Sequence, residues 1–325
     1  MDQTAVRKRL QAELDQVNKL ILDSLESDIE LLNRTNRALL DHPGKQLRPI
    51  LALLVARAIG GRVNDDTLRF AAASELLHNA TLLHDDVADG SAERRGRPTV
   101  MSLLGSRASV LLGDFWLVRA VARILEASRE SNRVIRIFAD TLADLAEGEM
   151  LQLQKASAGD TQEADYQRII YNKTASLFVA AALSAAISAQ ATPVQEEAVR
   201  SYAENLGMAF QIKDDIFDYQ ENASIGKPVG QDLQEQKITL PLLGALQAVP
   251  EQEASVRRMV TQIGEHPEYQ AEIVAFVKTR GGMDYAVARL DEYVDKAIAA
   301  LDVLPQGEDR QALADLARFV SERKS

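Results

Sequence analysis

Apolar residues recur every three to four positions along almost the whole chain, the repeat of an amphipathic α-helix. Strict alternation of apolar and polar residues, which marks a half-buried strand, is not convincing in any segment. Breaks such as Gly60-Gly61, Thr192-Pro193 and Gly281-Gly282 divide the pattern. We therefore predict helices over residues 3–40, 47–60, 65–89, 99–128, 131–154, 163–190, 194–219, 237–247, 252–264, 268–280, 283–301 and 308–322.

Composition supports a single large helical protein. Glycine (17) and proline (9) are scarce for 325 residues, while the abundant residues include strong helix formers. The length exceeds that of an average domain, but no segment has the composition of a linker. We predict one all-α domain over residues 1–325, in which a bundle of long helices holds a site built from facing side chains.

Charge and cysteine content exclude several classes of function. The net charge is −11 and the pI is about 5.0, which argues against a nucleic-acid partner. The absence of cysteine excludes disulfides, thiolate zinc sites and cysteine nucleophiles. The most apolar run, residues 177–191, is too short to span a membrane, so no transmembrane segment and a cytoplasmic location are expected.

Two acidic clusters carry the clearest chemical signal. Both read Asp-Asp-x-x-Asp and both are flanked by apolar helical sequence. On a helix the first and last aspartates share a face, where like charges destabilise the helix unless a cation neutralises them. Carboxylate oxygens favour Mg²⁺, which is usually held by one or two carboxylates together with substrate phosphates. We predict that six carboxylates converge on shared Mg²⁺ ions: Asp85, Asp86, Asp89, Asp214, Asp215 and Asp218.

Basic and polar residues accompany these clusters, although each has a simpler interpretation on its own. An arginine pair directly follows the first cluster, where it either forms surface ion pairs or binds phosphate oxygens. Lys45 and Arg48 are either solvated or bind a second anionic group, and Lys173 alone would be read as a lysine whose stem is buried and whose charge reaches solvent. The loop with Lys227 and Lys237 is either a plain exposed loop or closes over a phosphate. A lone histidine on a helix is more often a core residue than a ligand. These residues are Lys45, Arg48, His78, Arg94, Arg95, Lys173, Thr174, Gln211, Lys227 and Lys237.

Together the motifs resemble the trans-isoprenyl diphosphate synthases, also called polyprenyl synthetases. The resemblance rests on the order of motifs between residues 44 and 241, and Gln46 and Lys213 depart from the usual residues of that family. The matching motifs are Gly44-Lys45-Gln46-Leu47-Arg48-Pro49, Glu75-Leu76-Leu77-His78, Leu83-His84-Asp85-Asp86-Val87-Ala88-Asp89 with Arg94-Arg95-Gly96, Lys173-Thr174-Ala175, Phe210-Gln211-Ile212-Lys213-Asp214-Asp215-Ile216-Phe217-Asp218-Tyr219, Gly226-Lys227-Pro228 with Gly230 and Asp232, and Lys237.

The resemblance implies an antiparallel helix bundle around a central cavity, a homodimer, and condensation of isopentenyl diphosphate with an allylic diphosphate such as farnesyl diphosphate. It implies that Lys45, Arg48, His78 and Arg95 bind isopentenyl diphosphate. The allylic diphosphate would be bound by Arg94, Lys173, Thr174, Gln211, Lys227 and Lys237. The residues taken as catalytic are Asp85, Asp86, Asp89, Arg94, Lys173, Asp214 and Lys227.

Product length follows from the residues one turn before the first cluster. Ala80 and Thr81 are not aromatic, and the cluster carries no insertion, which resembles the long-chain synthases. We expect an all-trans product of about octaprenyl length. Phe138 either helps to form the floor of the product tunnel or is an ordinary core residue.

Four alternatives remain. A shorter-chain farnesyl or geranylgeranyl diphosphate synthase would share every motif. A terpene cyclase would lack the second acidic cluster and the second diphosphate site. A metal phosphohydrolase built on His84 and Asp85 would need further histidines at suitable spacing. A regulatory partner with the same fold usually loses the aspartates, and all six are present here.

Overall fold

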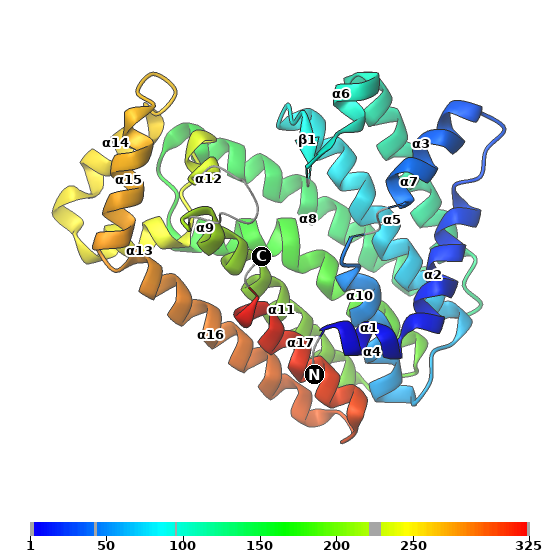
Figure 1. Cartoon of the computed structure of the whole chain (residues 1–325). Coiled ribbons are helices and arrows are strands. Elements are labelled where there is room, and N and C mark those ends of the chain that lie inside the picture. Colours follow the sequence, from blue (N-terminus) through cyan, green and yellow to red (C-terminus); the bar gives the residue numbers. More distant parts are fainter. Residues whose placement is uncertain (1–2, 42–43, 95, 221–228, 324–325) are drawn as a thin grey trace. The chain divides into compact units, whose positions relative to one another are not determined.

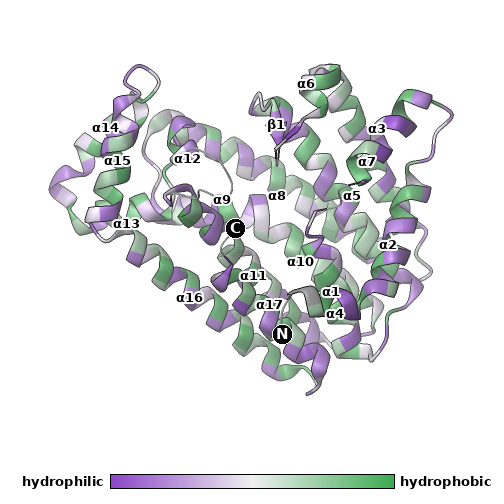
Figure 2. Cartoon of the chain, in the orientation of Figure 1, coloured by the Kyte–Doolittle hydropathy of each residue, from purple (hydrophilic) through white to green (hydrophobic). Residues whose placement is uncertain are grey.

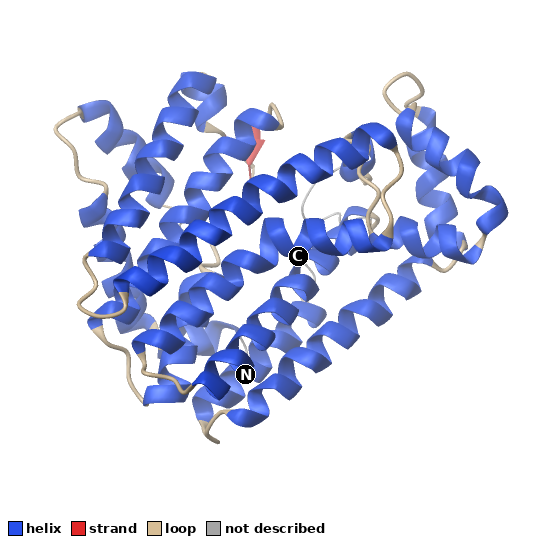
Figure 3. Cartoon of the chain, turned by 180° about the vertical axis from the view of Figure 1, so that it is seen from behind, coloured by secondary structure: helices blue, strands red, loops and turns tan. Residues whose placement is uncertain are grey.

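The computed structural model describes residues 3–41, 44–94, 96–220 and 229–323. These residues are almost entirely helical, and the prediction of an all-α fold is confirmed (Figure 3). A short antiparallel hairpin, β1 (Glu93–Arg94) and β2 (Arg97–Pro98), was not predicted from the sequence. It follows the first acidic cluster and presents Arg94 beside it.

The N-terminal region contains three helices where one was predicted. They are α1 (Gln3–Arg9), α2 (Gln11–Ser24) and α3 (Glu30–Leu40). Between α2 and α3 the Asn33 side chain accepts a hydrogen bond from the Ser27 N–H and donates one to the Ser27 carbonyl oxygen. Short polar side chains of this kind compete with the helical hydrogen bonds and favour a turn.

The remaining helices begin and end close to the predicted boundaries. The predicted helix over 99–128 is interrupted at Gly105, and α12 falls in a region predicted as a loop. The helices are α4 (Leu47–Gly60), α5 (Asp65–Ala88), α6 (Val100–Leu104), α7 (Ser106–Leu125), α8 (Ser131–Ala158), α9 (Glu163–Ile170), the π-helical turn η1 (Tyr171–Ala175), α10 (Ser176–Ser188), α11 (Pro193–Asp218), α12 (Gln231–Gln234), α13 (Leu240–Ala248), η2 (Pro250–Gln252), α14 (Glu253–Thr261), α15 (Glu268–Thr279), α16 (Gly282–Ala300), η3 (Leu301–Val303) and α17 (Glu308–Glu322) (Figure 1).

The chain forms two compact units. The first comprises Met1–Ala139, Ala180–Val199 and Val303–Leu313, and the second comprises Asp140–Val179, Arg200–Asp302 and Ala314–Ser325. The first acidic cluster belongs to the first unit and the second cluster to the second unit. One domain over residues 1–325 stays a prediction.

The first unit is organised around α4 and α5. Helix α4 is apolar on nearly all sides and is buried from Leu47 to Ala56 (Figure 2). Helix α5 packs against α2, α4 and α7, and Asn64 caps its N-terminus by accepting a hydrogen bond from the Thr67 N–H. The buried Trp116 Nε1 donates to Asn36 Oδ1 at 2.8 Å, which ties α3 to α7. These contacts fix the helix that carries the first acidic cluster.

One helical run among the described residues is long and apolar enough to cross a membrane. It extends over Glu163–Ser188, so it is longer than the apolar run recognised in the sequence. Within its most apolar window, 89% is buried inside the structure. Such burial is what the core helix of a globular protein shows.

Candidate functional site

The first acidic cluster lies at the C-terminal end of α5. The Asp89 N–H donates to the Asp85 carbonyl oxygen at 2.8 Å, so these two aspartates are one helical turn apart, as their spacing predicts. The Asp85 side chain is partly exposed and Asp89 is exposed, whereas Asp86 is buried. The outer two carboxylates are therefore accessible to a ligand, and the middle one faces the protein.

Arg94 neutralises the buried Asp86. Its Nε donates a 2.7 Å hydrogen bond to Asp86 Oδ1, and the Asp86 side chain is only 6% exposed. The Ser91 N–H also donates to the Asp86 carbonyl oxygen, which fixes the turn between α5 and β1. The predicted proximity of Arg94 to the acidic cluster is thus found in the structure. The second arginine of the pair, Arg95, lies outside the described residues.

His84 has a packing role that the sequence did not indicate. A Cβ atom at Gly113 of α7 would lie 2.4 Å from His84 Nε2, so the imidazole occupies the space that a side chain would fill. The ring also lies 3.3 Å from the Val110 carbonyl oxygen and from Asp114 Oδ1. This arrangement holds the end of α5 against α7 and leaves no support for the phosphohydrolase alternative.

The two basic residues at the start of α4 flank Gln46, whose backbone has the left-handed conformation. Gln46 has φ 49°, and its side chain accepts a 2.9 Å hydrogen bond from Arg7 and donates a 2.6 Å one to Asn18. Lys45 before it is exposed, and Arg48 after it is buried. Gln46, which departs from the resembled family, is therefore well accommodated.

His78 lies seven residues before Asp85 on α5 and is partly exposed. Thr81 is also partly exposed, and its hydroxyl donates to the His78 carbonyl oxygen at 2.8 Å. Ala80 and Phe138 are buried. The roles of Ala80, Thr81 and Phe138 in product length stay predictions.

In the second unit, Asp214 pairs with an arginine that we did not predict. Arg323 Nη2 lies 2.7 Å from Asp214 Oδ1. The adjacent Lys213 donates from Nζ to the Ser321 carbonyl oxygen at 2.7 Å, at the C-terminal end of α17. Burial, followed by the nearby charge of Arg323, lowers the pKa of Lys213. The unusual lysine thus caps a helix.

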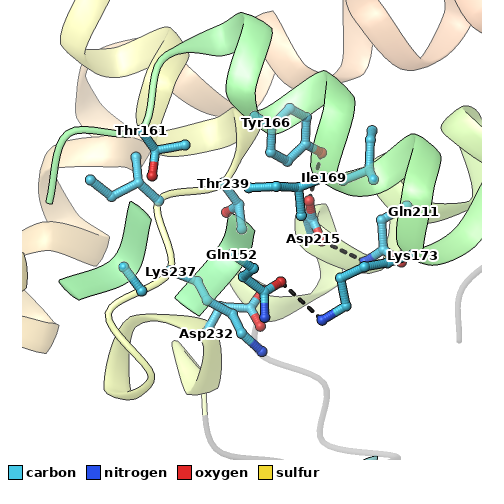
Figure 4. Close-up of a pocket in the computed structure, with 13 residues that line it drawn as sticks. Gln152, Thr161, Tyr166, Ile169, Lys173, Gln211, Asp215, Asp232, Lys237 and Thr239 are labelled. Carbon is cyan, nitrogen blue, oxygen red and sulfur yellow. Dashed lines mark hydrogen bonds between the residues drawn. The ribbon is translucent and has the colours of Figure 1, made fainter. Parts of the chain in front are cut away.

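Asp215 is a buried carboxylate with a donor on each oxygen. The Tyr166 hydroxyl donates to Oδ2 at 2.6 Å and Gln211 Nε2 donates to Oδ1 at 2.9 Å (Figure 4). Thr174 in turn donates to Gln211 Oε1 at 2.8 Å. Burial, with the charge of Asp232 adding to it, raises the pKa of Asp215 well above its usual range, although both hydrogen bonds act in the opposite direction.

Asp218 caps the short helix α12. Its two carboxylate oxygens accept backbone hydrogen bonds from Gln231 at 3.0 Å and from Asp232 at 3.1 Å. The Gly230 N–H also donates to the Asp218 carbonyl oxygen. In this structure Asp218 therefore anchors the segment that begins at residue 229. Lys227, which we predicted to bind diphosphate, lies outside the described residues.

A cavity of about 130 Å³ in the second unit brings several predicted residues together. Figure 4 shows Lys173 from η1, Gln211 and Asp215 from α11, and Lys237 from the segment after α12 around this space. Lys173 Nζ lies 2.5 Å from Glu149 Oε2 and donates to Gln152 Oε1 at 3.1 Å. The lining residues are Gln152, Ala156, Thr161, Tyr166, Ile169, Ile170, Lys173, Gln211, Asp215, Asp232, Lys237, Ile238 and Thr239.

Two glycines fit the π-helical turn that carries Lys173. A Cβ at Gly207 would lie 2.5 Å from the Ala175 Cα, and a Cβ at Gly148 would lie 2.7 Å from the Asn172 Cβ. Helices α8 and α11 therefore approach the turn more closely than side chains would allow. Because π-helical turns often occur at functional sites, this packing marks Lys173 as a positioned residue.

Charges of both signs share the cavity. Burial, followed by the charge of Asp218, raises the pKa of Asp232 to about 7, and the charges of Lys237 and Lys173 act in the opposite direction. A cavity with two lysines and poorly solvated carboxylates suits an anionic ligand whose charge the lysines balance.

The acidic residues suit a divalent cation whose remaining ligands are waters and substrate phosphates. Among the described residues, no three histidine, aspartate or glutamate side chains are gathered closely enough to hold a metal by themselves. Mg²⁺ usually takes one or two carboxylates and completes its shell with waters and substrate phosphates. Asp85, Asp214 and Asp218 are partly exposed and Asp89 is exposed, although both oxygens of Asp218 already accept backbone hydrogen bonds.

Sequence reasoning missed four residues of the site: Tyr166, Asp232, Gln152 and Arg323. Tyr166 and Arg323 reach their partners over separations of 49 and 109 residues, for which the chain carries no local signal. Gln152 was detectable, because it follows Glu149 by three positions on one helix face. Asp232 stands two residues after Gly230 in the sequence, but no local pattern indicates that it lines the cavity.

The sequence profile of the polyprenyl synthetase family matches residues 29–277. The chain is 40% identical to the octaprenyl diphosphate synthase of Haemophilus influenzae over 319 residues, which cover 98% of this chain and 96% of that protein.

Solved structures show the same similarity. A decaprenyl diphosphate synthase from Rhodobacter capsulatus superimposes with a TM-score of 0.91 at 36% identity and covers 99% of both chains. A polyprenyl synthase from Caulobacter crescentus CB15, complexed with calcium and isoprenyl diphosphate, also gives a TM-score of 0.91 at 36% identity, with 100% of this chain and 98% of that chain covered.

Proposed function

This chain belongs to the polyprenyl synthetase family, and from that premise we propose how its residues carry out prenyl transfer. It is a trans-prenyl diphosphate synthase that extends an allylic diphosphate with isopentenyl diphosphate to a long all-trans chain. The observation that carries the mechanism is the cavity in which Lys173, Gln211 and Lys237 come together from separate segments.

The aspartate clusters are the proposed binding groups for Mg²⁺. Asp85, Asp89 and Asp214 would supply carboxylate oxygens, and the buried Asp86 and Asp215 would support their neighbours. When bound, Mg²⁺ supplies positive charge to the diphosphate that leaves the allylic substrate. The calcium in the Caulobacter polyprenyl synthase is consistent with a divalent ion in this family.

The lysines of the cavity orient the allylic diphosphate. Lys173 is prepared for this role by Glu149 and Gln152, which hold its ammonium group before any ligand binds. Lys237 lines the same cavity. Preorganised cations stabilise the negative charge that grows on the leaving group without reorganising during the reaction. Arg94 and Lys227 complete the proposed set.

Isopentenyl diphosphate is bound by side chains alone and keeps its diphosphate. Lys45, Arg48 and His78 are the proposed ligands, together with Arg95. As the C–O bond of the allylic diphosphate breaks, its electron pair leaves with the diphosphate. The double bond of isopentenyl diphosphate then attacks the allylic cation, and the released diphosphate takes the proton that is lost. No covalent bond to the enzyme is needed.

The protein acts as a homodimer through one face of α7. Leu111, Val118 and Leu125 follow one another at seven-residue intervals and are 59%, 63% and 56% exposed. Large apolar side chains at this spacing form a stripe along a helix that favours packing against a second helix. A cytoplasmic location is also part of the proposal.

The function is tested by incubating the protein with farnesyl and isopentenyl diphosphates and Mg²⁺. We expect release of diphosphate that requires both substrates, and a long-chain product on chromatography. Release from farnesyl diphosphate alone would indicate a terpene cyclase instead. Excess chelator should abolish turnover, and full activity in its presence would contradict the proposed metal dependence.

A matched pair of variants connects this activity to the cavity. Lys173→Gln should reduce turnover by about 100-fold or more, because an electrostatic donor to the leaving group is lost. Lys155→Gln is the control, since Lys155 lies on α8 and pairs with Asp160 and Asp165 rather than lining the cavity. Equal activity of the two variants would refute the role of Lys173.

A further inference from the structure

Arg323 lies in a buried site formed by one face of α11. Its Nη2 donates a 2.7 Å hydrogen bond to Asp214 Oδ1 and a 3.0 Å hydrogen bond to the Phe210 carbonyl oxygen. The guanidinium carbon lies 4.2 Å from the centroid of the Phe210 ring and 5.3 Å from that of Phe217. The Arg323 side chain is only 5% exposed. It is therefore an ordered internal cation rather than a solvated surface charge.

The backbone next to Arg323 is also held by α11. The Arg323 N–H donates to the Phe319 carbonyl oxygen at 2.9 Å, which continues the last turn of α17. Lys213 Nζ binds the Ser321 carbonyl oxygen, and the Ser321 hydroxyl donates to Asp291 Oδ1 at 3.0 Å. Lys213 and Asp214 are consecutive, so two adjacent residues of α11 hold both the backbone and the side chain of this segment.

The ion pair uses one side of the Asp214 carboxylate. Oδ1 accepts the hydrogen bond from Arg323, yet 42% of the Asp214 side chain remains exposed. A carboxylate that is held through Oδ1 and is partly exposed to solvent can offer Oδ2 to a ligand. A group that hydrogen-bonds one oxygen of a ligating carboxylate fixes its orientation, and such partners commonly determine metal affinity.

Displacement of Arg323 by an incoming cation is disfavoured by its surroundings. To leave, the guanidinium would lose a carboxylate, a backbone carbonyl oxygen and the faces of two aromatic rings, all in a buried site. The neighbouring contact between Lys213 and Ser321 would also have to break. Arg323 therefore stays in place when Asp214 binds a ligand.

We propose that Arg323 is a positioning residue that holds the Asp214 carboxylate with Oδ2 directed toward the divalent cation. The inference rests on the proposed function, because it takes Asp214 as a metal-binding group. It adds a residue from the segment after α17 to the metal-binding groups proposed for the second acidic cluster. Its loss is expected to weaken cation binding, whereas a merely competing arginine would strengthen binding when removed.

The test measures the affinity of the full-length protein for Mn²⁺ in the presence of inorganic pyrophosphate. Electron paramagnetic resonance gives the concentration of free Mn²⁺. Arg323→Gln is expected to lower the affinity by about 10- to 100-fold, as for other partners of metal ligands. Arg323→Lys keeps the charge but not the planar fork, so its affinity should lie between those of the wild type and Arg323→Gln. Circular dichroism verifies that each variant is folded.

Two controls separate the possible failures. Arg318→Gln removes an exposed arginine of α17, the helix that precedes Arg323, and should leave the affinity unchanged. Asp214→Asn should weaken binding. If Asp214→Asn weakens binding and folded Arg323→Gln does not, or binds more tightly, the positioning role is wrong. If Asp214→Asn binds like the wild type, the proposed metal role of Asp214 fails and the inference falls with it. If Arg323→Gln does not fold, wild-type affinity in Arg323→Lys overturns the proposal.

Discussion

The hydroxyl of Tyr166 donates a 2.6 Å hydrogen bond to Oδ2 of Asp215, and both side chains are almost completely buried. Gln211 Nε2 donates a hydrogen bond to Oδ1 of the same carboxylate. Asp215 therefore differs from Asp214, its neighbour in the sequence, which is 42% exposed. Within one acidic cluster, one carboxylate anchors α11 to α9 and the other is open to a ligand.

The first prediction concerns this buried hydrogen bond. Tyr166→Phe leaves a buried carboxylate short of a donor, which should lower the free energy of unfolding by about 1–3 kcal/mol. Urea denaturation measures the change. Tyr269→Phe removes a hydroxyl outside the cavity and should change stability by less than about 0.5 kcal/mol. Equal stability of the two variants would show that the Tyr166 bond contributes little.

The second prediction concerns pH. The pKa of Asp232 is about 7 in the folded protein, well above that of an ordinary aspartate near 3.8. Between these values the folded state binds more protons than the unfolded state, so stability falls as pH rises. Asp232→Asn removes this titration. Its stability relative to the wild type should therefore increase from pH 5 to pH 7.

The size of that effect is bounded. One proton contributes at most about 1.4 kcal/mol per pH unit, and the partial exposure of Asp232 should reduce the slope to about half of that. Denaturation at pH 5, 6 and 7 in the presence of chelator measures it. A difference between Asp232→Asn and the wild type that does not change with pH would rule out a titrating Asp232.

The third prediction concerns the close contact between α11 and the π-helical turn. Gly207→Ala places a Cβ 2.5 Å from the Ala175 Cα, so the backbone must move. We expect a loss of about 1–3 kcal/mol in stability, together with weaker binding of pyrophosphate because Lys173 is displaced. Gly264→Ala is the matched control, since nothing lies within 4 Å of its Cβ position. If Gly207→Ala is destabilised but binds pyrophosphate like the wild type, this close contact does not determine the position of Lys173.

The fourth prediction concerns product length. Thr81→Phe should shorten the product, because an aromatic ring one turn before Asp85 would close the path of the growing chain. Ala80→Phe should act in the same direction, but Ala80 is buried and the larger side chain should also cost about 1–3 kcal/mol of stability. Chromatography of the dephosphorylated products measures chain length. Thr81→Val, which keeps the side chain at a similar size, is the control. If Thr81→Phe gives a product of unchanged length, Thr81 does not line the product tunnel.

The fifth prediction concerns the α7 stripe. Val118→Glu places a charge in the middle of the proposed dimer interface and should convert the protein to a monomer of 35.7 kDa in sedimentation experiments. Val194→Glu, which alters a valine of similar exposure on α11, should leave the dimer intact. A dimer that survives Val118→Glu at micromolar concentration would place the interface elsewhere.

Much of the fold and part of the site were predictable from local patterns. The 3.6-residue repeat gave most helices within a few residues, and it failed where side chains act on the backbone. The turn between α2 and α3 depends on hydrogen bonds between Asn33 and Ser27, and the hydrophobic pattern continues through it. Likewise, the hairpin that presents Arg94 to Asp86 is too short to show a strand repeat.

The sequence by itself determined the helical class, the family, and the placing of aspartates one turn apart on α5, because these depend on periodicity and on residue spacing within a single helix. Only the tertiary structure decided which aspartates are buried, which oxygens already have donors, and which cation accompanies each cluster. Those properties depend on burial and on partners such as Tyr166 and Arg323, which are distant in the chain and leave no periodic trace in it.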